Sequence, residues 1–199
     1  MSEHPSDYTG AKMGMWLFLF TEVILFGGLF VLYAVTLQRY PAEFHEASKL
    51  LSLTMGTVNT IVLITSSLFA VLAVTALQKA DIRKAKLFLL LTILLAAVFL
   101  VDKYFEWGAK IHHGIYPGGE EMASFKPGMQ AFFNLYYLMT GLHGLHIVIG
   151  MSVLGWVYWL IEKGKCTPEH FVALENGGLY WHLVDLIWIY LFPLYYLIA

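Results

Sequence analysis

Four residues near the C-terminus form a polar stripe that could take part in proton chemistry. His182, Asp185 and Gly178 follow Glu175 at offsets of seven, ten and three residues. On an α-helix these offsets fall within a sector of roughly 80°. His182 and Asp185 are one turn apart and close enough to hydrogen-bond. Because ionisable side chains are rare inside membrane helices, the stripe predicts a polar surface that faces the protein interior.

A second ionisable group, Glu22, interrupts an apolar run that begins near Met13. It lies roughly 14 Å into that run at 1.5 Å per residue. A charge near the bilayer centre costs about 2.5 to 3.5 kcal/mol, so this carboxyl must be neutral or paired. Two interpretations stay open, a carboxyl that joins two helices and a group that handles protons. In both, we expect Glu22 to be buried and to hydrogen-bond to a polar group on the fourth or fifth apolar segment.

Two more pairs of polar residues lie one helical turn apart. Lys103 and Glu106 share one helix face at i, i+3, where they should neutralise each other. His143 and His146 have the same spacing in the fourth apolar segment, beside glycines that would let another helix approach.

Three chemistries can be tested against these residues. His143 or His146 together with His182 could be axial haem ligands, but a porphyrin needs space between helices that this pattern does not clearly provide. A proton-coupled transporter using Glu22 and Asp185 should show paired halves or broken helices, and the sequence shows neither. The motifs of metalloproteases, α/β-hydrolases, P-loops and dinucleotide sites do not occur. We therefore expect no catalytic centre, haem or metal in this chain.

Composition defines the elements that must position these groups. Hydrophobic residues make up 59% of the 199 positions and charged residues 13%, with a mean hydropathy of +0.67. Such a chain cannot cover a soluble globule and is expected in a membrane. The net charge of −2, without a long block of one sign, excludes nucleic-acid binding. Cys166 is the one cysteine, so no intrachain disulfide can form.

The fold predicted is all-α, a polytopic membrane protein with a bundle of five transmembrane helices. Crossing a hydrocarbon core of about 30 Å takes about 20 apolar residues, and five stretches meet that requirement. No repeat or long polar segment divides the chain, so residues 1–199 should form a single domain. The expected spans are Met13–Leu37, Met55–Leu77, Leu87–Trp107, Phe132–Leu160 and Gly177–Ile198.

The basic residues predict the orientation of these spans. Seven Lys and Arg residues lie in the N-terminal segment and the second and fourth connections, against four in the first and third connections. By the positive-inside rule, the N-terminus should be cytoplasmic and the C-terminus outside.

Several stretches resemble subunit III of the haem-copper oxidases, the cytochrome c oxidase group, in its short five-helix form. The resemblance covers nearly all of the chain from Met13 onward, and its most specific parts contain the paired histidines and the polar stripe. The matching stretches are Met15–Glu22 with Phe26 and Phe30 beyond it, Asn59–Thr60, Ser66–Ser67, Lys103–Trp107, Thr140–His146 and Glu175–Trp188.

This resemblance implies a non-redox accessory subunit packed against catalytic subunit I of a terminal respiratory oxidase. Haem and copper are expected in partner subunits, with phospholipid bound here and a respiratory supercomplex left open. Family members help sustain proton uptake, protect the active site from inactivation and bind lipid. Glu22 matches the family's buried, carbodiimide-reactive carboxylate. The other candidate positions are Asn59, Glu106, His143, His146, Glu175, His182 and Asp185.

The chain departs from the longer family form, which has seven helices, because it begins at the equivalent of the third. The lipid cleft formed with the first two helices is therefore in doubt, and another chain could supply that pair. Quinol oxidases also carry five-helix third subunits, but Asn59–Thr60 and the Leu191–Leu194 ending favour the cytochrome c branch. The short form is typical of bacteria and predicts an inner-membrane location.

Overall fold

Long helices dominate the computed structural model, which describes residues 8–198. Five of these helices are long and apolar enough to cross a membrane, which confirms the predicted all-α class. The elements are α1 (Tyr8–Arg39), α2 (Pro41–Ser48), α3 (Leu53–Gln78), α4 (Ile82–His112), α5 (Glu120–Ser124), α6 (Pro127–Glu162), α7 (Val172–Pro193) and the π-helical turn η1 (Leu194–Ile198). Each predicted span lies within a longer helical segment, because the helices continue beyond the apolar stretch into polar residues.

Local sequence signals mark where these helices begin and end. The side chains of Ser52 and Asp81 accept backbone N–H bonds at the starts of α3 and α4. Pro127 stands in the first turn of α6, where its missing N–H costs nothing. Gly164 follows the end of α6 with φ 65°, a left-handed conformation that glycine adopts without strain. Pro193 ends α7, and the chain continues as the wider η1 turn.

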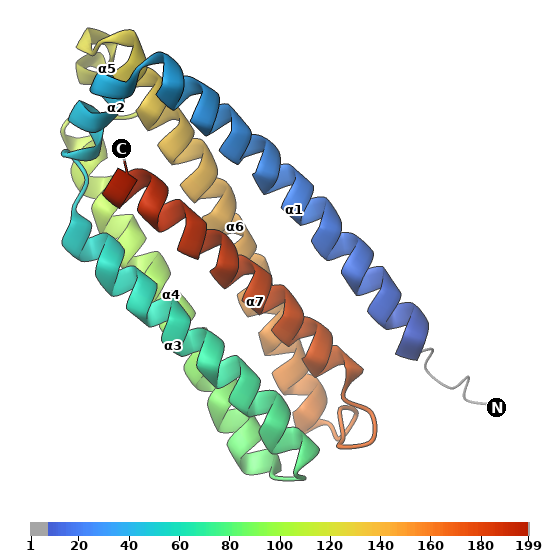
Figure 1. Cartoon of the computed structure of the whole chain (residues 1–199). Coiled ribbons are helices and arrows are strands. Elements are labelled where there is room, and N and C mark those ends of the chain that lie inside the picture. Colours follow the sequence, from blue (N-terminus) through green and yellow to red (C-terminus); the bar gives the residue numbers. More distant parts are fainter. Residues whose placement is uncertain (1–7, 199) are drawn as a thin grey trace.

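Helix α7 lies at the centre of the bundle. It packs against α1, α3 and α6, and α3 forms an antiparallel hairpin with α4 (Figure 1). The α3–α4 turn and the α6–α7 loop lie at one end of the bundle with the start of α1. The short helices α2 and α5 lie at the other end, near the C-terminus of the described chain (Figure 1).

An aromatic cluster holds that second end together. Tyr195 in η1 contacts Tyr33, Phe132 and Tyr136 in edge-to-face geometry, and Phe44 of α2 packs on Tyr33 and Phe132 in the same way. All five rings are buried. Edge-to-face pairs each add about 0.5 to 1.5 kcal/mol beyond area burial, so the cluster fixes α1, α2, α6 and η1 relative to one another.

Helix α1 is packed on one side only. Its exposed apolar side chains include Trp16, Leu17 and Phe20, each at least 60% exposed. A face of that composition requires contact with lipid or another apolar helix.

Candidate functional site

Glu22 of α1 is paired with His146 of α6 inside the bundle. The Glu22 Oε2 atom lies 2.8 Å from His146 Nε2, and the two side chains are 13% and 9% exposed. Phe26 packs edge-on against the imidazole and is itself buried. The hydrogen bond predicted from Glu22 to the fourth long helix is therefore confirmed, whereas its functional role stays a prediction.

The second ring nitrogen of His146, Nδ1, indicates how many protons the Glu22–His146 pair holds. Nδ1 lies 2.7 Å from the Leu142 carbonyl oxygen, which can only accept, so Nδ1 carries a proton. One further proton then lies between His146 Nε2 and Glu22 Oε2. It resides either on the carboxyl, with a neutral imidazole, or on the imidazole, with a carboxylate. The pair is neutral overall in both states, so it places no net charge in the membrane.

The polar stripe of α7 faces α3. His182 Nδ1 lies 2.6 Å from the Ser67 hydroxyl, and Asp185 lies beside that hydroxyl. Asp185 is buried, and neither carboxyl oxygen has a hydrogen-bond partner in the part of the chain that the structure describes. The expected bond between His182 and Asp185 is not formed, because His182 pairs across the helix interface instead.

Glu175 begins the stripe at the end of the bundle. Its carboxylate pairs with Lys12 Nζ at 3.0 Å and accepts from the Tyr8 hydroxyl at 3.1 Å. Both partners lie in the first two turns of α1. Glu175 therefore attaches the first turns of α1 to α7 and is only partly buried, unlike Asp185 at the far end of the stripe.

Lys103 and Glu106 form a buried ion pair on α4. Their Nζ and Oε2 atoms lie 2.6 Å apart, and Tyr196 bonds to both side chains, accepting from Lys103 at 2.8 Å and donating to Glu106 at 2.7 Å. The ammonium also lies 4.6 Å from the ring centre of Trp188. The predicted neutralisation is thus confirmed and involves η1 and α7 as well as α4.

His143 and Asn59 are fully buried among these elements. The His143 ring stacks on Trp188 and meets Phe99 edge-on. Neither nitrogen of His143 nor either amide atom of Asn59 has a hydrogen-bond partner among the described residues. His143 therefore packs as an aromatic ring between helices α4, α6 and α7.

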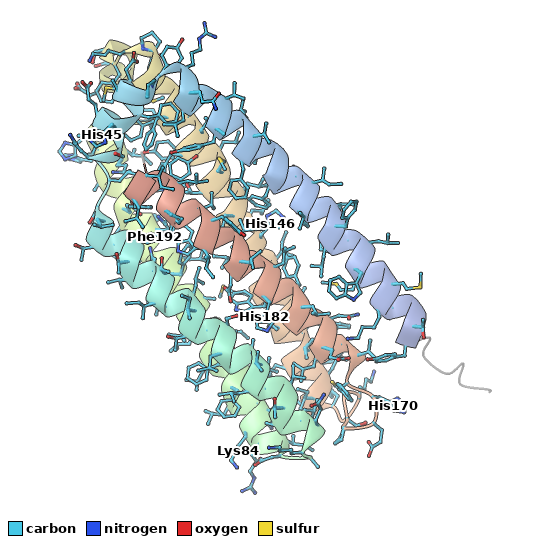
Figure 2. All side chains as sticks on the ribbon, viewed as in Figure 1. His45, Lys84, His146, His170, His182 and Phe192 are labelled. Atoms are coloured by element: carbon cyan, nitrogen blue, oxygen red, sulfur yellow. The ribbon has the colours of Figure 1, made fainter. Side chains whose placement is uncertain are left out.

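Five of the eight candidate residues fall into three groups, while Glu175 pairs with Lys12 at the end of the bundle and Asn59 and His143 have no hydrogen-bond partner among the described residues. Glu22 and His146 join α1 to α6, His182 and Asp185 face α3, and Glu106 belongs to the α4 ion pair. Figure 2 shows His146 and His182 within the bundle, with His45, His170 and Lys84 at its ends. Within residues 8–198, no three His, Cys, Asp or Glu side chains are grouped to hold a metal ion.

Sequence reasoning missed the partners Ser67 and Tyr196 as site residues. Ser67 lies in a stretch that carries the family resemblance, but nothing in α3 alone indicates that it faces His182. Tyr196 follows Pro193, and the proline was the available signal that the helix geometry changes before it.

These features define a class of protein, a polytopic all-α membrane protein with ionisable side chains buried between its helices. A sequence model of "Cytochrome c oxidase subunit III" matches residues 3–199. Cytochrome c oxidase subunit 3 of Thermostichus vulcanus is 32% identical over 205 residues, covering 99% of this chain and 90% of that protein. The chain belongs to the cytochrome c oxidase subunit III family, and is a multi-pass membrane subunit of a respiratory haem-copper oxidase.

Two further relatives show how widely the family extends. Quinol oxidase subunit 3 of Bacillus spizizenii is 28% identical, over 94% of this chain and 86% of that protein. A haem-copper oxidase subunit I+III of Aeropyrum pernix is 29% identical over 94% of this chain, which spans 22% of that protein.

Proposed function

We propose that this chain is the non-redox accessory subunit III of a terminal oxidase of the cytochrome c branch. In this role it packs on catalytic subunit I, binds membrane lipid, and supports proton uptake and stable turnover while its partner reduces oxygen. The observation that carries the proposal is the family match along nearly the whole chain. The buried Glu22–His146 pair adds a neutral, proton-exchanging group at the position that the resemblance singles out.

Contact with a catalytic subunit is supported by a relative and by the packing of α1. The Aeropyrum pernix protein carries subunits I and III in one chain, so this architecture is compatible with close packing of the two. The exposed apolar face of α1 offers a surface for such contact. Haem and copper would then belong to the partner subunits.

Lipid binding is supported by an apolar groove between α1, α6 and α7. It has a volume of about 460 Å³ and is lined by Met15, Phe18, Val153, Trp156 and Tyr180, among others. Its size and lining suit an acyl chain.

Orientation and location follow from the distribution of charge. The end with Lys12, the α3–α4 turn and the α6–α7 loop is the more basic one and would face the cytoplasm. The bacterial inner membrane is the proposed site, with the C-terminus outside.

Two alternatives make different predictions. A quinol-oxidase subunit III would have the same fold, and the higher identity to the Thermostichus vulcanus protein favours the cytochrome c branch. A haem-binding cytochrome would need two imidazoles that face a porphyrin-sized space. Both nitrogens of His146 are hydrogen-bonded, and the fully buried His143 ring, whose nitrogens have no partner among the described residues, is packed against Trp188 and Phe99 instead.

Affinity purification of the tagged chain from its native membrane tests the proposal. We expect haem-containing oxidase subunits to co-purify in constant ratio, and oxygen reduction with cytochrome c as donor. After the chain is separated from its partners, its optical spectrum should show no haem. Purification without any oxidase subunit, or haem retained by the separated chain, would contradict the proposal.

A further inference from the structure

A narrow groove between α3 and α7 leads toward the polar stripe. Its volume is about 190 Å³, and its lining combines the apolar side chains of Val71, Val74 and Leu179 with Lys12, Thr75, Glu175, Gly178 and His182. Lys12 and Glu175 form an ion pair at the end of the bundle and keep about a fifth of their side-chain surface exposed. The groove therefore extends from the charged Lys12–Glu175 pair at the end of the bundle to the imidazole of His182.

Gly178 leaves this groove open because it has no side chain. A Cβ atom at that position would lie 3.6 Å from Val74 of α3. A branched side chain in its place would occupy the space between the two helices, which offers a way to close the groove without touching a polar group.

Beyond His182, the polar groups continue inward as a short series. The Ser67 hydroxyl is 2.6 Å from His182 Nδ1 and lies beside Asp185. The Asp185 carboxyl is 4% exposed and has no hydrogen-bond partner among the described residues. The series of polar side chains thus ends at a buried carboxyl to which no described residue is hydrogen-bonded.

We propose that Asp185 exchanges protons with the aqueous phase at this end of the bundle through Ser67, His182 and the α3–α7 groove. In the inward step, a hydronium ion in the groove gives a proton to His182 Nε2 and becomes water, and His182 Nδ1 gives its proton to Ser67. The Ser67 hydroxyl, which is not hydrogen-bonded to Asp185 in this structure, turns toward an Asp185 oxygen and gives its proton to it in the same step. One proton enters, one O–H bond forms on Asp185, and His182 remains neutral with its proton on Nε2.

The other polar groups near this route already have partners, so they do not provide a second path for the proton. From α3, Ser66 is already bonded to Trp181 and to the Thr92 carbonyl. From α6, His146 is bonded to Glu22 and faces α1. Lys12 and Glu175 line the groove and bind each other. The Glu22–His146 pair and the series from His182 to Asp185 therefore make separate contacts.

This inference deepens the proposed function, and rests on it only for the statement that the groove opens toward the cytoplasm. Exchange of the Asp185 proton is a property of this chain and can be measured without turnover. Its failure is therefore distinguishable from failure of the chain to support an oxidase.

Infrared spectroscopy of the intact complex tests the route. The C=O stretching band of protonated Asp185 is obtained as the difference between wild type and Asp185→Asn across a pH series. Its shift after transfer to D₂O then reports how fast the proton exchanges. We expect a band that exchanges readily in wild type, and exchange about tenfold slower or more in Ser67→Ala, which lacks the relaying hydroxyl.

Three variants separate the relay from general effects. Ser67→Thr retains a hydroxyl and should exchange nearly as fast as wild type. Gly178→Val should slow exchange by closing the groove. Ser152→Ala removes an exposed hydroxyl that bonds only within α6, and should leave exchange unchanged. The proposal is overturned by absence of an Asp185 band at every pH, by wild-type exchange in Ser67→Ala, or by equal slowing in Ser152→Ala.

Discussion

Glu22 Oε2 and His146 Nε2 share a single proton at 2.8 Å, because His146 Nδ1 is already committed to the Leu142 carbonyl. The pair joins α1 to α6, and its two side chains together carry no net charge. This arrangement satisfies the energetic requirement that a carboxyl in an apolar helix be paired.

Substitution of Glu22 separates its structural role from its proton chemistry. In Glu22→Gln, the amide N–H can donate to the bare His146 Nε2, so the helices stay joined while the shared proton is lost. Glu22→Leu leaves that nitrogen without a partner, which should cost about 1 to 3 kcal/mol. Thermal unfolding of the complex measures the difference. Thr21→Val, which removes an exposed hydroxyl bonded within α1, is the control and should resemble wild type. Equal stability of Glu22→Leu and Glu22→Gln would contradict this account.

The Lys103–Glu106 ion pair should contribute strongly because it is buried. Lys103→Met leaves the Glu106 carboxylate with only Tyr196 as a partner, and an uncompensated buried charge costs about 3 to 5 kcal/mol. The exposed pair Lys86–Glu162, also at 2.6 Å, provides a matched control. Lys86→Met should have little measurable effect. Detergent-induced unfolding followed by circular dichroism compares the two, and similar losses would count against burial as the cause.

Close packing of α6 and α7 depends on Gly150. A Cβ atom there would lie 2.8 Å from the Trp181 ring, so Gly150→Ala should force the helices apart and cost about 1 to 3 kcal/mol. Gly155 lies on the same helix, and a Cβ atom at that position would meet nothing within 4 Å. Gly155→Ala should therefore stabilise α6 by up to about 1 kcal/mol through helix propensity. The melting temperatures of the two variants should move in opposite directions, and a fall in both would contradict the packing argument.

Cys166, in the loop between α6 and α7, should react slowly with maleimides. Burial raises the pKa of the Cys166 thiol, so the folded protein holds less thiolate at a given pH than a free cysteine, which ionises near about 8.5. The labelling rate should rise with pH along a curve displaced to higher pH than that of the unfolded chain. Mass spectrometry of timed samples measures both curves. A folded-state curve displaced to lower pH would show that the thiol is activated rather than buried.

Sequence patterns predicted the helices well because the bilayer itself imposes the rule. Long apolar runs must hydrogen-bond their own backbone in lipid, so the five runs could only be helices. The ends of the helices were harder to predict, because α1 and α6 extend several residues past the apolar stretches into polar sequence. Glu22 could be predicted to pair because an unpaired carboxyl would be too costly at its depth.

Most partners across helix interfaces could not be predicted from the sequence. The pairing of His182 with Ser67, rather than with Asp185, depends on how α3 and α7 are rotated about their axes. Tyr196 reaches Lys103 because the chain changes to π geometry after Pro193. Hydropathy and spacing give the face of a helix but not its depth relative to a neighbour, which is set by packing of the whole bundle.

The most direct test of the central claim is a comparison of oxygen consumption over many turnovers, with and without this chain. Membranes that lack the chain but contain the assembled remainder should begin at a rate comparable to that of wild type and then lose activity faster. Restoring the chain should restore the lifetime. The account would be contradicted by immediate and complete loss of electron transfer in a correctly assembled remainder, or by an unchanged lifetime when the chain is absent.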